Sequence, residues 1–325
     1  MTNAPILVTG VAGFIGSHTA LQLLERGERV IGIDNFNDYY APEQKRANVA
    51  VIERAGGEFE LIAGDIRDGA LIERTFAQHQ PRAVAHLAAM AGVRASVEQP
   101  LLYYDVNLTG TLTLLEAARR HGRPQFVFAS TSSAYGRSLV TPFVETDPAD
   151  RPLAPYPASK RAAELLGHSY HHMHGQDFTA LRFFTVYGPH GRPDMLAYMV
   201  LESMRLGRPM PLYNGGEMYR DWTYVGDIAN GVLAALDRPL GYEVINLGRG
   251  QPVKLSDFVA ALTALSGQAA HFVDARMNDA DVPYTGADID KARRLLGYDP
   301  RTSVAEGTRL FYEWYVENIG KIGTK

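Results

Sequence analysis

The sequence predicts an α/β protein: a doubly wound parallel sheet followed by a smaller C-terminal α/β lobe. Three observations predict this fold. Short apolar runs of strand length alternate with helical patterns over residues 1 to about 180. A glycine-spaced turn joins the first such run to the first helical pattern. After Gly188, glycine and proline divide the chain into shorter elements.

The strands and helices are expected in regular alternation. The expected strands are Ile6–Thr9, Arg29–Ile33, Phe59–Ala63, Ala83–His86, Gln125–Ser130 and Phe178–Phe183. The main helical patterns are Ser17–Arg26, Pro100–His121, Ala158–His174, Leu255–Ser266 and Val304–Asn318. In such a sheet, ligands bind at the carboxyl ends of the strands. Because the last sheet strand can come from the second half, we expect one domain of residues 1–187 plus a returning segment around 220–250, and a lobe of residues 188–325.

Composition excludes several classes of protein. The chain has 325 residues and a net charge of -4, which argues against a nucleic-acid partner or a basic membrane surface. It has no cysteine, which excludes disulfides and thiol catalysis. No apolar run reaches membrane-spanning length, and the first strand at Ile6 leaves no room for a signal peptide, so a cytoplasmic protein is expected. The histidines at 168, 171, 172 and 174 indicate a surface or interface rather than a metal site, and we expect no metal.

The first strand ends in a turn that suits a phosphate group. Gly10 permits the tight turn, Gly13 lets the backbone approach a pyrophosphate, and Gly16 lets helix and strand pack closely. Asp34 ends the second strand about 20 residues later, where a carboxylate accepts hydrogen bonds from the adenosine ribose and repels a 2′-phosphate. This Rossmann pattern favours NAD over NADP. The alternative is an ordinary βα turn with a surface aspartate.

Polar and small residues follow the later strands. Asp65 follows the third strand, where its carboxylate is expected either to meet the adenine amine or to cap a helix. Leu87, Ala88 and Ala89 follow the fourth, where small residues would let a cofactor lie against backbone. Four hydroxyl residues, 130–133, end the fifth. They lie where a parallel sheet binds its ligand, so we expect one of them to hydrogen-bond the reacting oxygen rather than to line a solvated loop.

Tyr156 and Lys160 are four residues apart on a predicted helix and therefore share a face. An ammonium near a phenol favours the phenolate, so the sequence predicts that Lys160 lowers the pKa of Tyr156 toward neutrality. Such a tyrosine can take a proton from a sugar hydroxyl while a nicotinamide takes the hydride. The alternative is a surface pair on a helix.

Together, the glycine turn, the His86–Ala89 strand end, the hydroxyl run and Tyr156/Lys160 resemble the extended short-chain dehydrogenase/reductase family, whose members are NAD-dependent sugar-nucleotide epimerases and dehydratases. The resemblance implies that Tyr156 is the catalytic base, that Lys160 binds the nicotinamide ribose, and that Thr131 bonds the sugar O4. It also implies NAD contacts at Gly10, Gly13, Phe14, Ile15, Gly16, Asp34, Asn35, Asn37, Asp65, Ile66, Leu87, Ala88, Ala89, Asn107, Tyr156, Lys160 and Phe183.

Finer features narrow the member of the family. Dehydratases of the family carry Asp-Glu after the catalytic threonine, and decarboxylases of UDP-glucuronate carry a glutamate two residues after it; this chain has Ser132 and Ser133. What remains is oxidation and re-reduction at C4. Residues 34–40, 91–94, 188–195 and 213–224 resemble the enzymes that interconvert UDP-glucuronate and UDP-galacturonate. The alternatives are a 4-epimerase of UDP-glucose or UDP-N-acetylhexosamine, and a non-catalytic NAD-sensing protein.

The substrate carboxylate needs its own binding groups. Oxidation at C4 of a glucuronate makes a β-keto acid, which loses carbon dioxide when its C5–carboxylate bond aligns with the ketone π system. Arg192 and Thr185 are expected to hold the carboxylate away from that alignment, because an arginine fork binds carboxylate at two points.

The resemblance also implies contacts to the nucleotide: Arg220 to the diphosphate, Tyr213 to the uridine and Asp281 to its ribose. Ala280 departs from the family pattern, which has glycine before this aspartate. A homodimer through the helices at 100–121 and 158–174 is implied by the resemblance alone. The full set of expected substrate residues is Gly92, Arg94, Ser132, Ser133, Thr185, Arg192, Tyr213, Arg220 and Asp281.

Overall fold

A computed structural model describes residues 4–275 and 281–320 of the chain. Its centre is a sheet of seven parallel strands in the order β11-β6-β5-β4-β1-β2-β3. These strands are β1 (Ile6–Thr9), β2 (Val30–Asp34), β3 (Phe59–Ala63), β4 (Ala83–His86), β5 (Gln125–Thr131), β6 (Phe178–Phe183) and β11 (Tyr242–Leu247). The order turns outward in both directions from β1 and β4, so the fold is the doubly wound sheet that the alternating pattern predicts.

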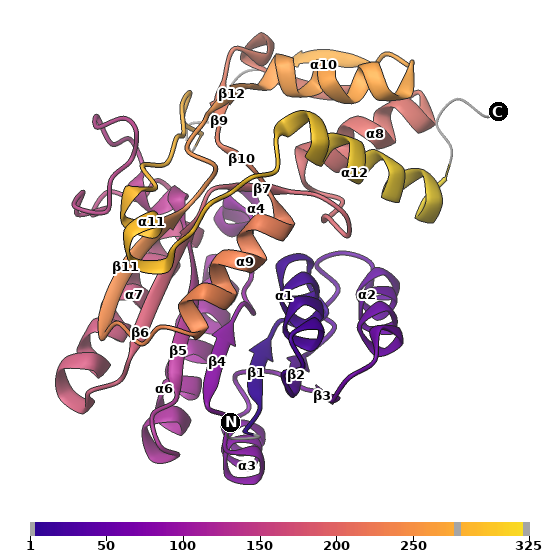
Figure 1. Cartoon of the computed structure of the whole chain (residues 1–325). Helices are drawn as coiled ribbons and strands as arrows, with labels where there is room; N and C mark the ends of the chain where they lie inside the picture. Colours follow the sequence, from indigo (N-terminus) through magenta and orange to yellow (C-terminus); the bar gives the residue numbers. More distant parts are fainter. Residues whose placement is uncertain (1–3, 276–280, 321–325) are drawn as a thin grey trace.

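Helices cover both faces of this sheet (Figure 1). On one face α1, α2 and α9 pack together; on the other α3, α6 and α7 do. Each face has its own apolar core: Ile6, Val8 and Leu23 belong to one, and Leu7, Ile31 and Leu114 to the other. Alternate side chains of β1 therefore pack into the two cores, because neighbouring side chains of a strand point to opposite faces of the sheet. The helices so far are α1 (Phe14–Glu25), α2 (Pro42–Ala55), α3 (Gly69–His79), α6 (Gly110–Arg120), α7 (Pro155–His174) and α9 (Val225–Leu236).

The lobe that follows residue 188 is built from short elements around a third apolar core that includes Met204, Trp222 and Phe258. Its helices α8, α10 and α12 gather at one end of the molecule (Figure 1). Their bounds are α8 (Leu196–Leu206), α10 (Leu255–Ser266), α11 (Asp290–Leu296) and α12 (Val304–Asn318). The short strands pair as β7 (Thr185–Tyr187) with β10 (Trp222–Tyr224), β9 (Tyr219–Arg220) with β12 (Val253–Lys254), and β8 (Met210–Tyr213) with β13 (Phe272–Ala275).

One predicted helix is wrong in detail. The segment Pro100–His121 is not a single α-helix: α5 (Pro100–Tyr104) passes into a π-helical turn, Asp105–Thr109, before α6 begins at Gly110. The physical reason is the side chain of Asn107, which is buried in this turn and hydrogen-bonds backbone outside the helix. A π-helical turn re-aims one side chain out of the helical register.

Two other boundaries differ by a few residues. α1 begins at Phe14, directly after the glycine turn, and α7 begins at Pro155, so that Tyr156 lies in its first turn rather than ahead of it. Proline is favoured at the first position of a helix, where its missing N–H leaves nothing unsatisfied. Among residues 4–275 and 281–320, no helix combines the length and apolar composition needed to cross a bilayer.

Candidate functional site

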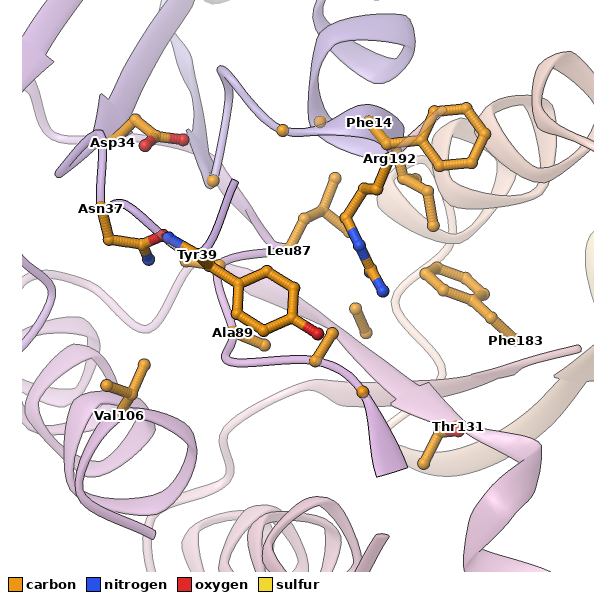
Figure 2. Close-up of a pocket in the computed structure, with 18 of the residues that line it drawn as sticks. Phe14, Asp34, Asn37, Tyr39, Leu87, Ala89, Val106, Thr131, Phe183 and Arg192 are labelled. Carbon is orange, nitrogen blue, oxygen red and sulfur yellow. The ribbon is translucent and has the colours of Figure 1, made fainter. Parts of the chain in front are cut away.

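A cavity of about 370 Å³ lies at the carboxyl ends of the central strands. Figure 2 shows Asp34 and Asn37 at one end of it and Thr131 and Phe183 at the other. Twenty of the expected residues line it: Gly10, Gly13, Phe14, Ile15, Gly16, Asp34, Asn35, Asn37, Asp65, Ile66, Leu87, Ala88, Ala89, Gly92, Thr131, Tyr156, Lys160, Phe183, Thr185 and Arg192.

The glycine turn forms the floor of this cavity and leaves no room for side chains. Gly10 has φ +71°, and a Cβ there would lie 2.7 Å from the backbone nitrogen of Ala88. A Cβ on Gly16 would lie 2.0 Å from the carbonyl oxygen of Gly10. α1 starts beyond Gly13 without a side-chain cap, so its first N–H groups are free to bind phosphate oxygens. The turn therefore fits the pyrophosphate of a dinucleotide.

Two carboxylates lie at the adenosine end. Asp34 accepts hydrogen bonds from the backbone nitrogens of Ala12 (3.1 Å) and Phe36 (2.9 Å), and burial nevertheless raises its pKa. Asp65 does not cap α3, because Asp68 does. Instead Asp65 accepts from Asn35 and Arg67, and the hydrogen bonds from Arg67 lower its pKa to about 2.

The opposite end holds Thr131, Tyr156 and Lys160. β5 ends at Thr131, and the first two turns of α7 carry Tyr156 and Lys160. The Nζ of Lys160 is buried, has no hydrogen-bond partner among the described residues, and lies 4.2 Å from the centroid of the Phe128 ring. Burial lowers the pKa of Lys160 to about 7. An orphaned buried amine that lines a cavity is suited to hydroxyl acceptors, and a ribose offers these.

The prediction that Lys160 lowers the pKa of Tyr156 toward neutrality is wrong in this structure. Burial raises the pKa of Tyr156 above 10, while the Thr131 hydroxyl and the charge of Arg192 lower it. Two physical causes explain the difference: a phenolate loses hydration in the cavity, and Lys160 itself is partly neutral near pH 7. Tyr156 is thus held as a neutral phenol, hydrogen-bonded to Thr131.

A second cavity, of about 550 Å³, adjoins the first. Tyr39, Gly92, Thr185 and Arg192 line both, so they mark the junction. The side chain of Arg192 is 22% exposed and makes two hydrogen bonds of 2.9 Å to the carboxylate of Asp194. Its guanidinium reaches into the first cavity toward Tyr39 (Figure 2). A partly buried cation beside Thr185 is suited to an anionic group of a ligand that enters from the second cavity.

The expected nucleotide contacts Tyr213, Arg220 and Asp281 line the second cavity, and so does Arg94, which is expected as a substrate residue. Arg94 donates to Asp281 at 2.8 Å, and its guanidinium carbon lies 4.0 Å from the centroid of the Tyr213 ring. Arg220 makes no ion pair to a described residue, and burial lowers its pKa. It is therefore an available cation for a diphosphate. Ala280 lies outside the described residues.

Three expected contacts line neither cavity. Ser132 and Ser133 belong to a short 3₁₀ turn behind Thr131, whose hydroxyl accepts from the backbone nitrogen of Ser133. Asn107 is buried behind the wall, where it bonds Met90 at its N–H (2.8 Å) and C=O (3.0 Å) and donates to Ser159 (3.0 Å). Asn107 braces the cavity rather than lining it.

Sequence reasoning missed other lining residues. Tyr39, Tyr40 and Lys45 line the first cavity, and Asp194 lines the second. Tyr39, Tyr40 and Asp194 lie in stretches that carried the family resemblance, which was the available signal. Lys45 lies in α2 and gave no signal, because its contacts to Asn37 form only in the fold. In the described part of the chain, no cluster of three histidine or carboxylate side chains could hold a metal ion.

Comparisons with known proteins agree with this geometry. A model of the NAD-dependent epimerase/dehydratase family matches residues 6–248. The chain is 43% identical over 315 residues to UDP-glucuronate 4-epimerase of Thermodesulfobacterium geofontis, with 96% of each chain covered. It is 41% identical to UDP-glucuronate 4-epimerase 4 of Arabidopsis thaliana, covering 96% of this chain and 75% of that protein.

Solved structures give the same result. UDP-glucuronic acid 4-epimerase of Bacillus cereus, in complex with UDP-glucuronic acid and NAD, matches with a TM-score of 0.90 and 34% identity over 96% of this chain and 99% of that one. UDP-glucose 4-epimerase of Thermotoga maritima, with UDP-glucose, matches with a TM-score of 0.88 and 32% identity over 97% of this chain and 99% of that one.

Proposed function

The chain belongs to the NAD-dependent epimerase/dehydratase family, and from this premise we propose that it interconverts UDP-glucuronate and UDP-galacturonate. It is an NAD-dependent UDP-sugar 4-epimerase, and its cofactor is NAD. The observation that carries the choice of substrate is Arg192, a guanidinium at the junction of the two cavities, which Thr185 also lines. Neutral UDP-sugars have no group that needs such a cation.

We propose that the first cavity holds NAD. The glycine turn would bind the pyrophosphate, Asp34 the adenosine ribose, and Lys160 the nicotinamide ribose through its orphaned amine. Bound NAD supplies an acceptor for the hydride of C4 and afterwards returns that hydride. Residues 1–187, with the segment around 220–250, form the NAD-binding part in this proposal, and residues 188–325 bind the UDP-sugar.

In the proposed mechanism, Tyr156 takes the O4 proton as C4 is oxidised, and the Thr131 hydroxyl orients the reacting oxygen. The hydrogen bond between Thr131 and Tyr156 places both groups at one point of the cavity wall. Tyr156 returns the proton after the sugar has turned its other face to the nicotinamide. Configuration at C4 is thereby inverted, and no net oxidation occurs.

The intermediate of this reaction is a 4-keto acid, and the protein must keep its carboxylate. We propose that Arg192 and Thr185 hold that group so that the C5–carboxylate bond stays out of line with the ketone π system. Arg220, Tyr213, Asp281 and Arg94 would meanwhile hold UDP in the second cavity. The nucleotide must stay fixed while the sugar moves, because the sugar has to rotate without leaving the cavity.

We also propose a homodimer and a cytoplasmic location, as expected from the sequence. Large apolar side chains are exposed on four adjoining helical segments, α4 (Val93–Glu98), α5, α6 and α7. They are Val97, Leu101, Tyr104, Leu112 and Leu165. Exposed apolar surface of this kind marks an interface. Cell fractionation tests the location, and substitution of these exposed leucines tests the dimer.

The defining experiment is incubation of the purified, NAD-loaded enzyme with UDP-glucuronate without added reductant, followed by proton NMR of the sugar. We expect UDP-galacturonate to form without net NADH. Formation of a decarboxylated sugar as the main product, or no reaction at all, would contradict the proposed function. UDP-glucose in the same assay tests the alternative substrate: it should be a poor substrate and a weak competitor.

A further inference from the structure

Arg192 is held by one edge of its guanidinium. Its Nε donates to Asp194 Oδ1 and its Nη2 to Asp194 Oδ2, both at 2.9 Å. A guanidinium carries five N–H donors and has a second edge, formed by Nη1 and the other hydrogen of Nη2, that also fits a carboxylate. No described residue accepts a hydrogen bond from Nη1. The pair with Asp194 therefore uses one edge and leaves the other available.

Asp194 is itself fixed from the opposite wall. The Tyr39 hydroxyl donates to Asp194 Oδ2 at 3.1 Å. Tyr39 also interacts with the hydroxyl of Tyr103, which donates to the Ala91 carbonyl at 2.8 Å. The Tyr103 ring in turn meets the Tyr156 ring edge-on, with centroids 6.2 Å apart. The orientation of Arg192 is thus set relative to Tyr156 through a chain of contacts that runs through Asp194.

We propose that Asp194 is a positioning residue for the epimerase reaction: it holds Arg192 by its Nε edge, so that the Nη1 edge receives the substrate carboxylate in a single orientation. This inference rests on the proposed function. Asp194 also offsets part of the charge of Arg192 as its ion-pair partner, so the substrate carboxylate is held by directed hydrogen bonds as well as by charge. Such hydrogen bonds orient the substrate carboxylate and break when the keto sugar rotates.

Removal of Asp194 would therefore change both the orientation of the bound carboxylate and the net charge around Arg192. A bare guanidinium binds a carboxylate by either edge and attracts an anionic substrate more strongly. The substrate would bind at least as well, but its C5–carboxylate bond would no longer be confined. Turnover to the epimer should fall, and loss of carbon dioxide from the 4-keto intermediate should rise. That loss cleaves the C5–carboxylate bond and releases CO₂, and the electron pair of the bond forms an enolate with the C4 ketone. The enolate takes a proton from water at C5 to give a 4-keto pentose, and the hydride of C4 remains as NADH.

The test compares Asp194→Asn with Asp194→Glu and the control Asp299→Asn in the NAD-loaded enzyme. Asparagine keeps the shape but presents one acceptor and an amide donor, so the two-point pair is lost. Glutamate restores a carboxylate. Asp299 pairs with Arg301, also two residues away, at 2.9 Å on an exposed surface. Each variant is assayed with UDP-glucuronate for KM, kcat, the ratio of epimer to decarboxylated product by NMR, and NADH by absorbance.

For Asp194→Asn we expect kcat for epimerisation to fall by about tenfold or more, an unchanged or lower KM, and a decarboxylated fraction several times that of the wild type, in line with the loss of a charge-assisted two-point contact. Asp194→Glu should recover part of the product ratio, and Asp299→Asn should match the wild type. A wild-type product ratio in Asp194→Asn would overturn the proposal. So would a raised KM with an unchanged ratio, or loss of bound NAD, because either result indicates a merely structural role.

The same experiment separates the two proposals. If the wild-type enzyme does not convert UDP-glucuronate into UDP-galacturonate, the proposed function fails. If the wild type converts it cleanly and Asp194→Asn does the same, only the role of Asp194 fails.

Discussion

At the scale of single residues, the chemistry depends on the phenol of Tyr156. Burial raises its pKa more than the hydrogen bond from Thr131 and the charge of Arg192 lower it, so this tyrosine is a poor base until the O4 proton is transferred in step with the hydride. Removal of one general acid–base group costs about 10²–10⁴-fold in rate. We expect Tyr156→Phe to lose at least about 10³-fold in epimerisation while NAD stays bound, as measured by NMR and by the NAD content of the purified protein.

Tyr298 offers the matched control for that substitution. Its hydroxyl is buried, has no hydrogen-bond partner among the described residues, and lies outside both cavities. Tyr298→Phe should therefore turn over like the wild type. Retention of most activity in Tyr156→Phe would remove Tyr156 from the mechanism.

Lys160 predicts a pH dependence of stability. Burial lowers its pKa from 10.5 to about 7, whereas the unfolded chain keeps the higher value. Between these two pH values the unfolded state binds more protons, so the free energy of unfolding contributed by Lys160 increases with pH by about 1.4 kcal/mol per unit. Below about pH 7 both states are protonated and this dependence disappears.

Urea unfolding of NAD-free protein from pH 6 to 9 measures this effect. The slope between pH 7 and 9 should be smaller in Lys160→Met than in the wild type, whereas Lys291→Met, which removes a lysine paired with Glu243, should keep the wild-type slope. Identical slopes in the wild type and Lys160→Met would show that Lys160 is not buried as described.

At the scale of elements, α1 and α2 hold the turn that carries Arg192. His18 of α1 bonds the Pro189 carbonyl (2.9 Å), and Gln44 of α2 donates to the Gly191 carbonyl (3.1 Å). Asn48 of α2 connects two turns: its Nδ2 donates to the Ala12 carbonyl in the glycine turn (2.9 Å), and its Oδ1 bonds His190 Nδ1 (2.7 Å). The glycine turn and the turn that carries Arg192 are thus joined through the same side chain, Asn48.

Asn48→Ala removes both bonds and leaves one buried partner, the Ala12 carbonyl, and one partly buried partner, His190, unsatisfied. An unsatisfied buried partner costs about 1–3 kcal/mol, and a partly buried one costs less. We expect a free energy of unfolding lower by about 2–4 kcal/mol, faster loss of NAD on dilution, and a higher decarboxylated fraction. Denaturant titration, NAD release and product NMR measure the three effects. A destabilised variant with unchanged NAD release and product ratio would confine Asn48 to a structural role.

The elements differ in how well the sequence predicts them. Six of the seven strands and the glycine turn follow from local patterns: strand-length apolar runs, a helix period and three spaced glycines. The seventh strand, β11, is expected only as part of a returning segment around 220–250. The π-helical turn does not follow from local patterns, because it depends on Asn107 meeting Met90 and Ser159, which are 17 and 52 residues away in the chain. Local propensity contains no information about such partners.

The candidate site also has features that the sequence predicts and features that it does not. Many residues that line the first cavity lie at strand ends and in recognisable motifs, so most of its lining was predicted. The sequence cannot show that Asp194 occupies one edge of Arg192 or that burial leaves Tyr156 a neutral phenol. Both depend on which groups the fold brings together and on how much water it excludes.

At the scale of the whole molecule, the protein has a net charge of -4, although the ligands proposed for it, NAD and UDP-glucuronate, are also anionic. Local cations line the cavities instead: Arg192 at the junction and Arg220 in the second cavity. The second cavity is lined by Arg94 of α4, which precedes β5 in the chain, and by Tyr213 and Asp281 of the lobe, so in the proposed function both halves must be in place before UDP is held. The cavity at the sheet edge and the cavity in the lobe therefore act as one site.

The remaining prediction concerns assembly. Leu101 is 85% exposed on α5 and Leu165 is 55% exposed on α7, and these helices pack against each other. Burying one leucine is worth about 1.5–3 kcal/mol, and a two-fold dimer contains each substitution twice. Leu101→Glu or Leu165→Glu should therefore raise the dimer dissociation constant by about 100-fold or more, as measured by light scattering after size exclusion. Leu139→Glu, at a residue 99% exposed in the loop after β5, is the control and should leave a dimer. If Leu101→Glu and Leu165→Glu assemble like the control, the dimer does not use this surface, and the exposed leucines of α5 and α7 need another explanation.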